Sequence, residues 1–337
     1  MMRYLFISFL ISNAFITFVS STSQEGAYKQ KLIDLGKQLN RIELQLNTSV
    51  NQILQKFDTN NQRILNSIKS LRYSQFNSLY FYLFEQEKHN ILFLEDHGIR
   101  PVTALLIIDV QIDFINGTLA LRDCPSKHNG EEVVPVINQL VDNFNFDVIV
   151  YSHDWHPTDH ISFFDNLSLR SKLLANDSTP LEDLHLYSKA IFSLNTTLNM
   201  EQTLWPRHCV QNSFGAQLHP DLEVVNTTNN RTVIHIQKGT KPDIDSYSAF
   251  WDNLKLSETS LNKQLKKLGV THVFLTGIAT DWCVYSTGIH ALEYGYETFL
   301  IEDACRGVNE NTIKENLQIF QDKNGHVIQS NEVKNYV

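Results

Sequence analysis

The stretch from Val273 to Leu292 constrains the fold more than any other part of the chain. It begins with an apolar run typical of a buried strand, is broken at Gly277, and resumes with helical spacing at Val284 and Ile289. A strand that leads directly into a helix is the repeating unit of open α/β sheets, in which ligands bind where the strands end. The stretch therefore predicts such a sheet, with a site beside this turn.

Cys283 lies in this turn, preceded by Thr280 and Asp281 as predicted helix-capping residues. A thiol at the start of a helix faces unpaired N–H groups, which favour the thiolate. We therefore interpret Cys283 as a nucleophile. The alternative is a small buried residue that packs the helix on the sheet, since free cysteine is often buried.

Strand and helix signals alternate from Pro101 onward. This order predicts an α/β fold over residues 101–337, with a doubly wound, mainly parallel sheet flanked by helices. The polar stretch from Asn166 to Asn199 is interpreted as an exposed insertion. The expected strands are 104–109, 148–151, 232–237, 273–275 and 298–301, and the expected helices are 132–144, 261–268 and 312–320.

The first 100 residues are of a different kind. Arg3 precedes an apolar run that is short and interrupted by polar residues, so residues 1–21 are predicted to be a secretory signal peptide, with a signal anchor as the alternative. Apolar residues at helical spacing predict a helical, coiled-coil-like segment over residues 22–100. These helices either pack as a hairpin on their neighbour or join copies of the chain in a homo-oligomer.

Seven N-x-Ser/Thr triplets agree with secretion. We therefore expect a glycoprotein that is secreted or held in the endomembrane lumen. The predicted acceptors are Asn47, Asn116, Asn166, Asn176, Asn195, Asn226 and Asn230.

Composition excludes two classes of protein. The formal net charge is -9 and no basic cluster is present, so nucleic acid is not an expected partner. Four cysteines are too few for a disulfide scaffold in a chain of 337 residues.

Two further strands end in charged side chains. Asp109 ends the first strand, as either a helix cap or a functional acid, and Asp113 one turn later is interpreted as structural. Lys238 ends the strand before Gly239. It is either a solvated strand-end lysine or the partner of a thiolate or carboxylate.

The strand at 148–151 leads into a loop rich in metal ligands. Asp154, His156 and His160 are spaced D-x-H-x-x-x-H, and His208 beside Cys209 follows on a separate loop. A carboxylate with imidazoles suits zinc, iron or manganese. We predict one divalent metal ion, with zinc as the first choice and ordinary surface histidines as the alternative.

The segments DVQIDF, SHDWHPTDH, WPRHC, KG…YSAF and GIATDWCV occur in this order. They resemble the nicotinamidase branch of the isochorismatase-like cysteine hydrolases, over about residue 103 to the C-terminal region. The resemblance implies a catalytic triad, a metal site with a further or water-mediated ligand, and aromatic pocket walls. These are Asp109, Lys238 and Cys283 for the triad, Asp154, His156, His208 and additionally His160 for the metal, and Phe114, Trp205 and Tyr247 for the walls.

The resemblance also implies a cis peptide bond between Ile278 and Ala279. It further implies an oxyanion hole formed by the backbone N–H groups of Ala279 and Cys283. The implied reaction is hydrolysis of nicotinamide to nicotinate and ammonia through a Cys283 thioester, with the metal orienting the substrate. The alternatives are another small aromatic amide such as pyrazinamide, a non-amidase vinyl-ether hydrolase of this fold, and a catalytically silent assembly protein.

Overall fold

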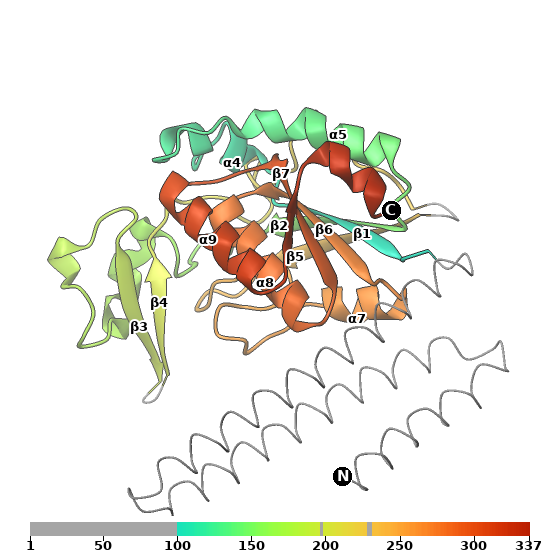
Figure 1. The fold of residues 1–337 in the computed structure, drawn as a ribbon. Helices are drawn as coiled ribbons and strands as arrows, with labels where there is room; N and C mark the ends of the chain where they lie inside the picture. Colours follow the sequence, from blue (N-terminus) through green and yellow to red (C-terminus); the bar gives the residue numbers. More distant parts are fainter. Residues whose placement is uncertain (1–99, 196–197, 228–230) are drawn as a thin grey trace, which may run out of the picture. The chain divides into compact units, whose positions relative to one another are not determined.

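The computed structural model describes residues 100–195, 198–227 and 231–337 (Figure 1). The predicted signal peptide 1–21, the helical segment 22–100 except Arg100, and the acceptors Asn47 and Asn230 lie outside the described residues. The expectations for these residues, including self-association through the N-terminal helices, stay predictions. In the described part of the chain, no helix has the length and apolar character to span a membrane.

Six parallel strands form the central sheet, in the order β5-β2-β1-β6-β7-β8. β1 is buried along its whole length, because an apolar TALLII strand suits the middle of a sheet covered on both faces. The strands are β1 (Thr103–Ile108), β2 (Val148–Asp154), β5 (Thr232–Lys238), β6 (His272–Ile278), β7 (Glu297–Arg306) and β8 (His326–Ile328).

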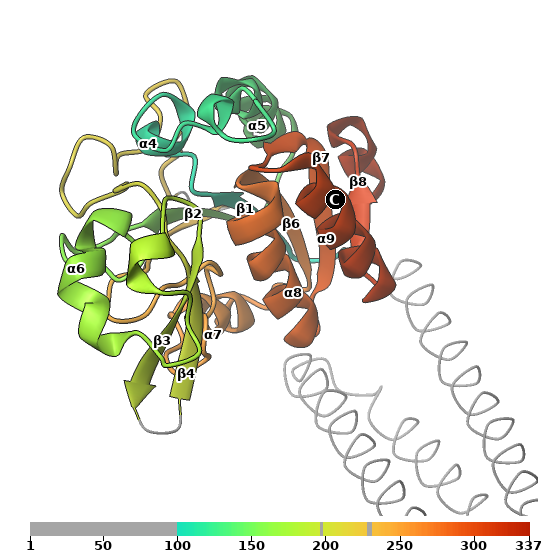
Figure 2. The same ribbon diagram turned by 90° about the vertical axis from the view of Figure 1, so that its left-hand side faces the viewer.

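Helices cover both faces of this sheet (Figures 1 and 2). Successive side chains of β1 point to opposite faces, so Leu105 packs in the core under α5, while Leu106 packs in the core under α7, α8 and α9. The predicted doubly wound α/β fold is confirmed. The helices are α4 (Ile112–Ile115), α5 (Val133–Asn143), α6 (Leu167–Arg170), α7 (Leu261–Lys267), α8 (Tyr285–Glu293) and α9 (Glu310–Asp322).

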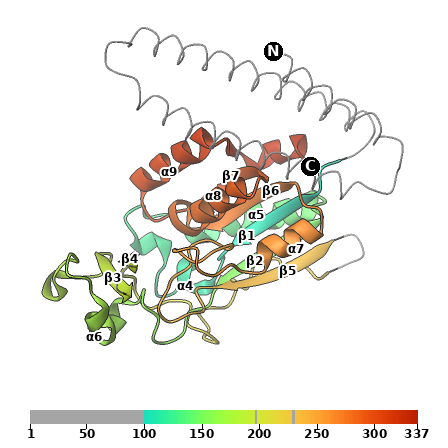
Figure 3. The ribbon, with the colours of Figure 1, turned by 90° about the horizontal axis from the view of Figure 1, so that it is seen from below.

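The stretch interpreted as an exposed insertion is more ordered than expected. It contains most of an antiparallel hairpin, β3 (Lys189–Asn195) and β4 (Leu198–Thr203), which lies outside the main sheet beside α6 (Figure 3). The hairpin and its neighbours share a small apolar core that includes Leu167, Phe192 and Met200. The polar composition concealed this core because only alternate residues of the strands face it.

The order of the strands places a topological switch point between β1 and β6. The chain adds β2 and β5 on one side of β1, and then adds β6, β7 and β8 on the other side. Ligands of open α/β sheets bind at such a point, beyond the carboxyl ends of the strands. Asp109 directly follows β1, and a cis peptide bond joins Ile278 to Ala279 at the end of β6, as the resemblance implies.

The close contact between β6 and β1 depends on Gly277. Its φ is +107°, and a Cβ atom there would lie 2.1 Å from the carbonyl oxygen of Ile108. We predict that Gly277→Ala lowers the free energy of unfolding by about 3–4 kcal/mol, because backbone strain and a clash with the neighbouring strand add up. Denaturant unfolding followed by circular dichroism measures this loss.

Gly295→Ala is the matched control. Gly295 has a φ of +82°, and nothing lies within 4 Å of an added Cβ atom. This variant should lose only the strain component, about 1–2 kcal/mol. Equal losses in the two variants would contradict the clash at Ile108.

Candidate active site

Three predicted catalytic residues meet at the carboxyl edge of the sheet. Lys238 Nζ lies 2.8 Å from Asp109 Oδ2 and 3.3 Å from Cys283 Sγ. Their relative exposures are 1%, 0% and 6%, so all three are removed from bulk solvent. They come from the ends of β5, β1 and β6, which explains how residues far apart in the sequence share one site.

The Lys238 ammonium also contacts Asp154 and donates a hydrogen bond to the backbone oxygen of Ser246 at 3.1 Å. Burial alone would lower the pKa of Lys238, but the carboxylates of Asp109 and Asp154 raise it well above its usual range. Lys238 is therefore a charged lysine held between two acids. The alternative of a solvated strand-end lysine is wrong.

Asp109 is a fully buried acid with an unusual backbone conformation. Its φ is +49°, a left-handed backbone conformation that a non-glycine residue seldom adopts. The Ser152 hydroxyl donates a hydrogen bond to Asp109 Oδ1 at 2.6 Å. Burial raises the pKa of Asp109 above its usual range, although Lys238 and the Ser152 hydrogen bond oppose the shift. A carboxylate with a raised pKa is better suited to accept a proton near neutral pH.

Cys283 lies in a π-helical turn, Thr280–Val284, between β6 and α8. The predicted capping role of Thr280 and Asp281 is wrong, because no side chain caps this turn. The Asp281 carboxylate instead accepts hydrogen bonds from the backbone N–H groups of Val308 and Asn309. This contact ties the turn to the segment before α9.

The expected thiolate form of Cys283 is also corrected. Burial raises the pKa of the Cys283 thiol well above its usual range, and the charges of Asp109 and Asp154 raise it further. Lys238 lowers this pKa but does not outweigh the other effects. The thiol is thus the resting form, and a nearby base must take its proton before it can act as a nucleophile.

Asp154, His156 and His208 form a compact group of metal-ligating atoms. Asp154 Oδ2 lies 3.3 Å from His156 Nε2 and 3.7 Å from His208 Nε2. Burial alone would raise the pKa of Asp154, but Lys238 and His156 hold it well below its usual range. Asp154 is therefore ionised and shared between this group, through Oδ2, and Lys238, through Oδ1.

The tautomers of the histidines suit metal binding. The Nδ1 atom of His156 lies 2.9 Å from the Gly239 carbonyl oxygen, and Nδ1 of His208 lies 2.7 Å from that of Pro206. A carbonyl oxygen can only accept, so each Nδ1 carries a proton, and Nε2 is the nitrogen that can give its lone pair to a metal when the ring is neutral. One carboxylate and two such nitrogens fit a divalent ion of the zinc, iron or manganese type.

His160 lies beside this group rather than within it. Its ring stacks on His156 at a centroid distance of 4.0 Å, and its Nδ1 pairs with Ser162 Oγ at 2.7 Å. Its buried Nε2 has no hydrogen-bond partner among the described residues and lies 3.9 Å from Asp245 Oδ1. His156, His160 and Asp245 thus form a second group of ligating atoms, which fits His160 as a further or water-mediated ligand.

The predicted pocket walls lie around the same site. Phe114 packs against the metal-group residue His208 at a ring distance of 5.4 Å. Trp205 and Tyr247 both pack against Trp282, at 4.8 and 5.0 Å. Trp282 was not predicted, although its position next to Cys283 in the sequence is a signal for it.

Gln111 is a second residue that the sequence analysis missed. Its buried amide accepts a hydrogen bond from the backbone N–H of Asp154 and donates one to its carbonyl oxygen, each at 2.8 Å. It thereby fixes the backbone that carries the metal-site carboxylate. Nothing in the local sequence distinguishes this glutamine from a solvent-exposed one.

The predicted glycosylation acceptors differ in exposure. Asn116, Asn176 and Asn226 are exposed, while the side chain of Asn195 lies outside the described part. The prediction for Asn166 is wrong for the folded chain: this residue is buried, and its Nδ2 donates to the carbonyl oxygens of Thr158 and His160. A glycan on that nitrogen would break both bonds.

The family description "Isochorismatase domain" matches residues 103–332, which include every residue of the site described above. The chain belongs to the isochorismatase family. The nicotinamidase of Escherichia coli (strain K12) is 37% identical over 212 residues, which cover 62% of this chain and 85% of that protein. Together with similar curated nicotinamidases from other organisms, this places the chain in the nicotinamidase branch of the isochorismatase family.

Solved structures agree with this placement in the isochorismatase family. A nicotinamidase and pyrazinamidase of Acinetobacter baumanii has a TM-score of 0.56 and 33% identity, covering 69% of this chain and 98% of that one. A protein of L. infantum, solved in complex with nicotinate, has a TM-score of 0.52 and 28% identity, covering 68% of this chain and 93% of that one.

Gly239 gives a test of the metal group. Its φ is +61°, and an added Cβ atom would lie 2.4 Å from Cε1 and 2.6 Å from Nδ1 of His156. We predict that Gly239→Ala displaces the His156 ring and weakens zinc binding by about 10–100-fold, the usual effect of disturbing a residue that orients a ligand. Competition between the metal-free protein and a chromophoric chelator measures the affinity. Gly295→Ala should keep the wild-type value, and wild-type affinity in Gly239→Ala would refute the assignment of His156.

Proposed function

We propose that this protein hydrolyses nicotinamide to nicotinate and ammonia through a thioester on Cys283. The observation that carries the proposal is that the buried Lys238 ammonium contacts Cys283, Asp109 and Asp154 at the same time. It supports a nucleophile, a base and a metal site acting on one small molecule. The nicotinamidase relatives and the relative solved with nicotinate support the choice of substrate.

The first half of the reaction forms the thioester. A carboxamide is a weak electrophile, so Asp109 takes the Cys283 thiol proton while Lys238 stabilises the developing thiolate. Sγ then attacks the amide carbon. By resemblance to the family, the backbone N–H groups of Ala279 and Cys283 would donate hydrogen bonds to the oxyanion. Each such donor stabilises the transition state by about 3 kcal/mol in comparable sites.

The second half releases both products. Asp109 returns its proton to the amide nitrogen, the carbon–nitrogen bond breaks, and ammonia leaves. Asp109 then takes a proton from water, whose oxygen attacks the thioester carbon. The carbon–sulfur bond breaks, the proton held by Asp109 returns to Cys283, and the product acid loses its remaining proton to solvent and leaves as nicotinate. Throughout the cycle Lys238 keeps a positive charge beside whichever group carries the negative one.

Asp154, His156 and His208 would hold the metal, with His160 beside them. When bound there, a divalent ion supplies Lewis acidity that can hold the pyridine nitrogen of the substrate. The flat ring would lie among Phe114, Trp205, Tyr247 and Trp282, whose apolar faces exclude water from the reacting amide. A similar aromatic amide such as pyrazinamide offers the same ring nitrogen and carboxamide, and it is the second candidate substrate.

We also propose that the chain enters the secretory pathway as a glycoprotein and self-associates through residues 22–100. The support is the sequence of residues 1–21 for secretion, the exposed acceptors Asn116, Asn176 and Asn226 for glycosylation, and the apolar residues at helical spacing in residues 22–100 for self-association. Expression in a eukaryotic secretory host, endoglycosidase digestion and light scattering test these points. Retention in the cytosol with no mobility shift would refute secretion and glycosylation, and a monomer would refute self-association.

Replacement of the nucleophile should abolish turnover. We predict that Cys283→Ala lowers ammonia release from nicotinamide by about 10⁴-fold or more, because the proposed thioester forms on the thiol that this variant lacks. The matched control is Cys124→Ala, a buried core cysteine whose Sγ lies 3.8 Å from the Ala120 carbonyl oxygen, which should keep wild-type kcat. Zinc-loaded wild type without ammonia release, or a Cys283→Ala variant that stays active, would exclude the proposed reaction.

The pH profile tests Asp109 as the base. Activity needs the carboxylate form, so it should fall as pH falls through the raised pKa of Asp109. The Ser152 hydrogen bond lowers that pKa, and its loss in Ser152→Ala should raise it further. We predict that the acidic limb of kcat/KM moves to higher pH in Ser152→Ala and stays in place in Ser126→Ala, whose hydroxyl bonds Gly307. An unmoved or acid-shifted limb would contradict this role.

A further inference from the structure

The hairpin β3–β4 contacts the metal-region residue Asp245 through the side chain of Gln202. Gln202 lies near the end of β4, pairs with Ala190 of β3, and is fully buried. Exposed and buried residues alternate along β4, so Glu201 faces outward while Met200 and Gln202 face inward. Met200, the preceding inward-facing residue, is apolar, whereas Gln202 places a polar amide on the same buried face.

The amide of Gln202 contacts two parts of the site. Its Nε2 donates to the Thr203 carbonyl oxygen at 2.9 Å and to Asp245 Oδ2 at 3.0 Å, and it lies 3.3 Å from the Tyr247 hydroxyl. Carbonyl and carboxylate oxygens can only accept, so they fix which end of the amide faces them. The donor end of Gln202 therefore faces Asp245.

The other end of the amide shows that this orientation has a cost. Gln202 Oε1 is buried and has no hydrogen-bond partner among the described residues. An unpaired buried acceptor carries a free-energy penalty that an apolar side chain of the same length would avoid. The donor end of the same amide bonds Asp245 and the Tyr247 hydroxyl.

Both acceptors belong to the site. The other oxygen of Asp245, Oδ1, accepts the Ser246 N–H at 2.8 Å and lies 3.9 Å from His160 Nε2. Asp245 thus completes the second group of ligating atoms, while Tyr247 packs on Trp282. One amide from outside the main sheet therefore contacts a carboxylate of the metal region and a wall of the substrate pocket.

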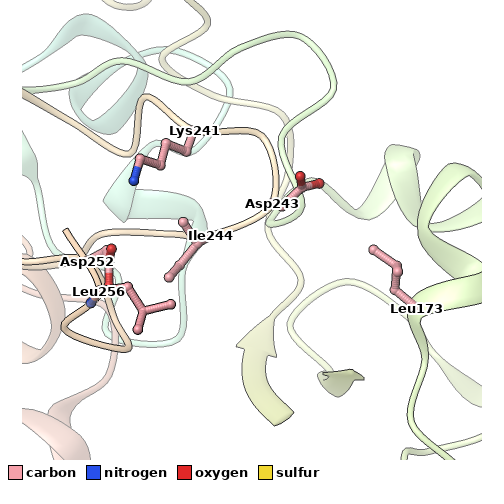
Figure 4. Close-up of a pocket in the computed structure, with 6 residues that line it drawn as sticks. All are labelled: Leu173, Lys241, Asp243, Ile244, Asp252 and Leu256. Carbon is pink, nitrogen blue, oxygen red and sulfur yellow. The ribbon is translucent and has the colours of Figure 1, made fainter. Parts of the chain in front are cut away.

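The packing of the hairpin region explains why this contact is stable. Ile244 shares the apolar core of the hairpin and directly precedes Asp245. Figure 4 shows a surface pocket between Leu173 and five residues of the segment 241–256, which include Ile244 and Asp252. None of Asp109, Lys238 and Cys283 lines it. The hairpin region thus abuts the segment 241–256 beside the catalytic centre.

We propose that Gln202 is a positioning residue that fixes Asp245 and Tyr247, and that the hairpin thereby sets metal affinity and substrate affinity. The inference rests on the proposed function for its substrate, but its metal part does not need that substrate. The structure places no contact between Gln202 and Asp109, Lys238 or Cys283 in the described part of the chain, so the chemical steps should be nearly unaffected.

The decisive variant is Gln202→Met, which keeps the length of the side chain and removes both polar ends. We expect zinc affinity of the metal-free protein, measured against a chromophoric chelator, to fall about 10-fold. With zinc saturating, KM for nicotinamide should rise roughly 5-fold, because Tyr247 loses its neighbour, while kcat stays within about 3-fold. Unchanged zinc affinity in the variant overturns the proposal.

Asn262→Leu is the matched control. Asn262 is another buried amide, in α7, which donates to Glu258 and accepts from the Tyr296 hydroxyl, away from the site. It should lose stability in thermal unfolding but keep wild-type zinc affinity and KM. If both variants lose zinc affinity equally, the effect is general destabilisation and the proposal fails. A wild type without nicotinamidase activity refutes the proposed function alone, since the zinc comparison still decides the role of Gln202.

Discussion

The site depends on one buried positive charge. The Lys238 ammonium is almost fully removed from solvent and contacts two carboxylates and the thiol of Cys283. Two carboxylates this close would not both stay ionised in a dry interior without a cation between them. Lys238 thus keeps Asp154 charged for a metal, while burial raises the pKa of Asp109 for proton transfer although Lys238 opposes that shift. Lys238 therefore lies between the catalytic residues Asp109 and Cys283 on one side and the metal-group residue Asp154 on the other.

The sheet explains how this charge reaches its partners. Parallel strands end at one edge, and Asp154 pairs in register with Lys238 across β2 and β5. Asp109 follows β1, next to β2, and the turn of Cys283 follows β6 on the other side of β1. The topological switch at β1 and β6 leaves the opening in which these side chains meet. The order and direction of the strands therefore bring these side chains to one place at the edge of the sheet.

Much of this arrangement could be predicted from the sequence, because alternating strand and helix patterns show where each strand ends and which residue follows it. The strand-end positions of Asp109, Lys238 and Cys283 were predictable in this way, as were Asp154 and His156 from their spacing, whereas the triad role followed from the family resemblance. The remainder depends on contacts between distant segments. Neither the donor end of Gln202 nor the clamp of Gln111 leaves such a pattern, because a glutamine reads as a surface residue until its partners are known.

The same limit explains the errors. Asn166 matched an acceptor triplet, but its side chain is buried, donates to the His160 carbonyl oxygen and accepts from Arg207 on a distant loop. The Cys283 turn looked like a capped helix start, whereas Asp281 binds the segment before α9 and the turn is π-helical. Burial then reversed the expected effect on the thiol pKa. Local patterns report propensity, while charge states depend on the tertiary surroundings.

The most direct test of this account is the pH dependence of the unfolding free energy in Lys238→Met. At pH 7 the variant buries two uncompensated carboxylates, and we predict a loss of about 3–5 kcal/mol. Without Lys238 the folded-state pKa values of these acids rise, so protonation should shrink the loss as pH falls from 7 toward about 4. Lys255→Met, which breaks a half-exposed pair with Glu293, should change stability by less than about 1 kcal/mol at either pH. A Lys238→Met variant as stable as wild type at pH 7, or a loss independent of pH, would contradict the central role of this charge.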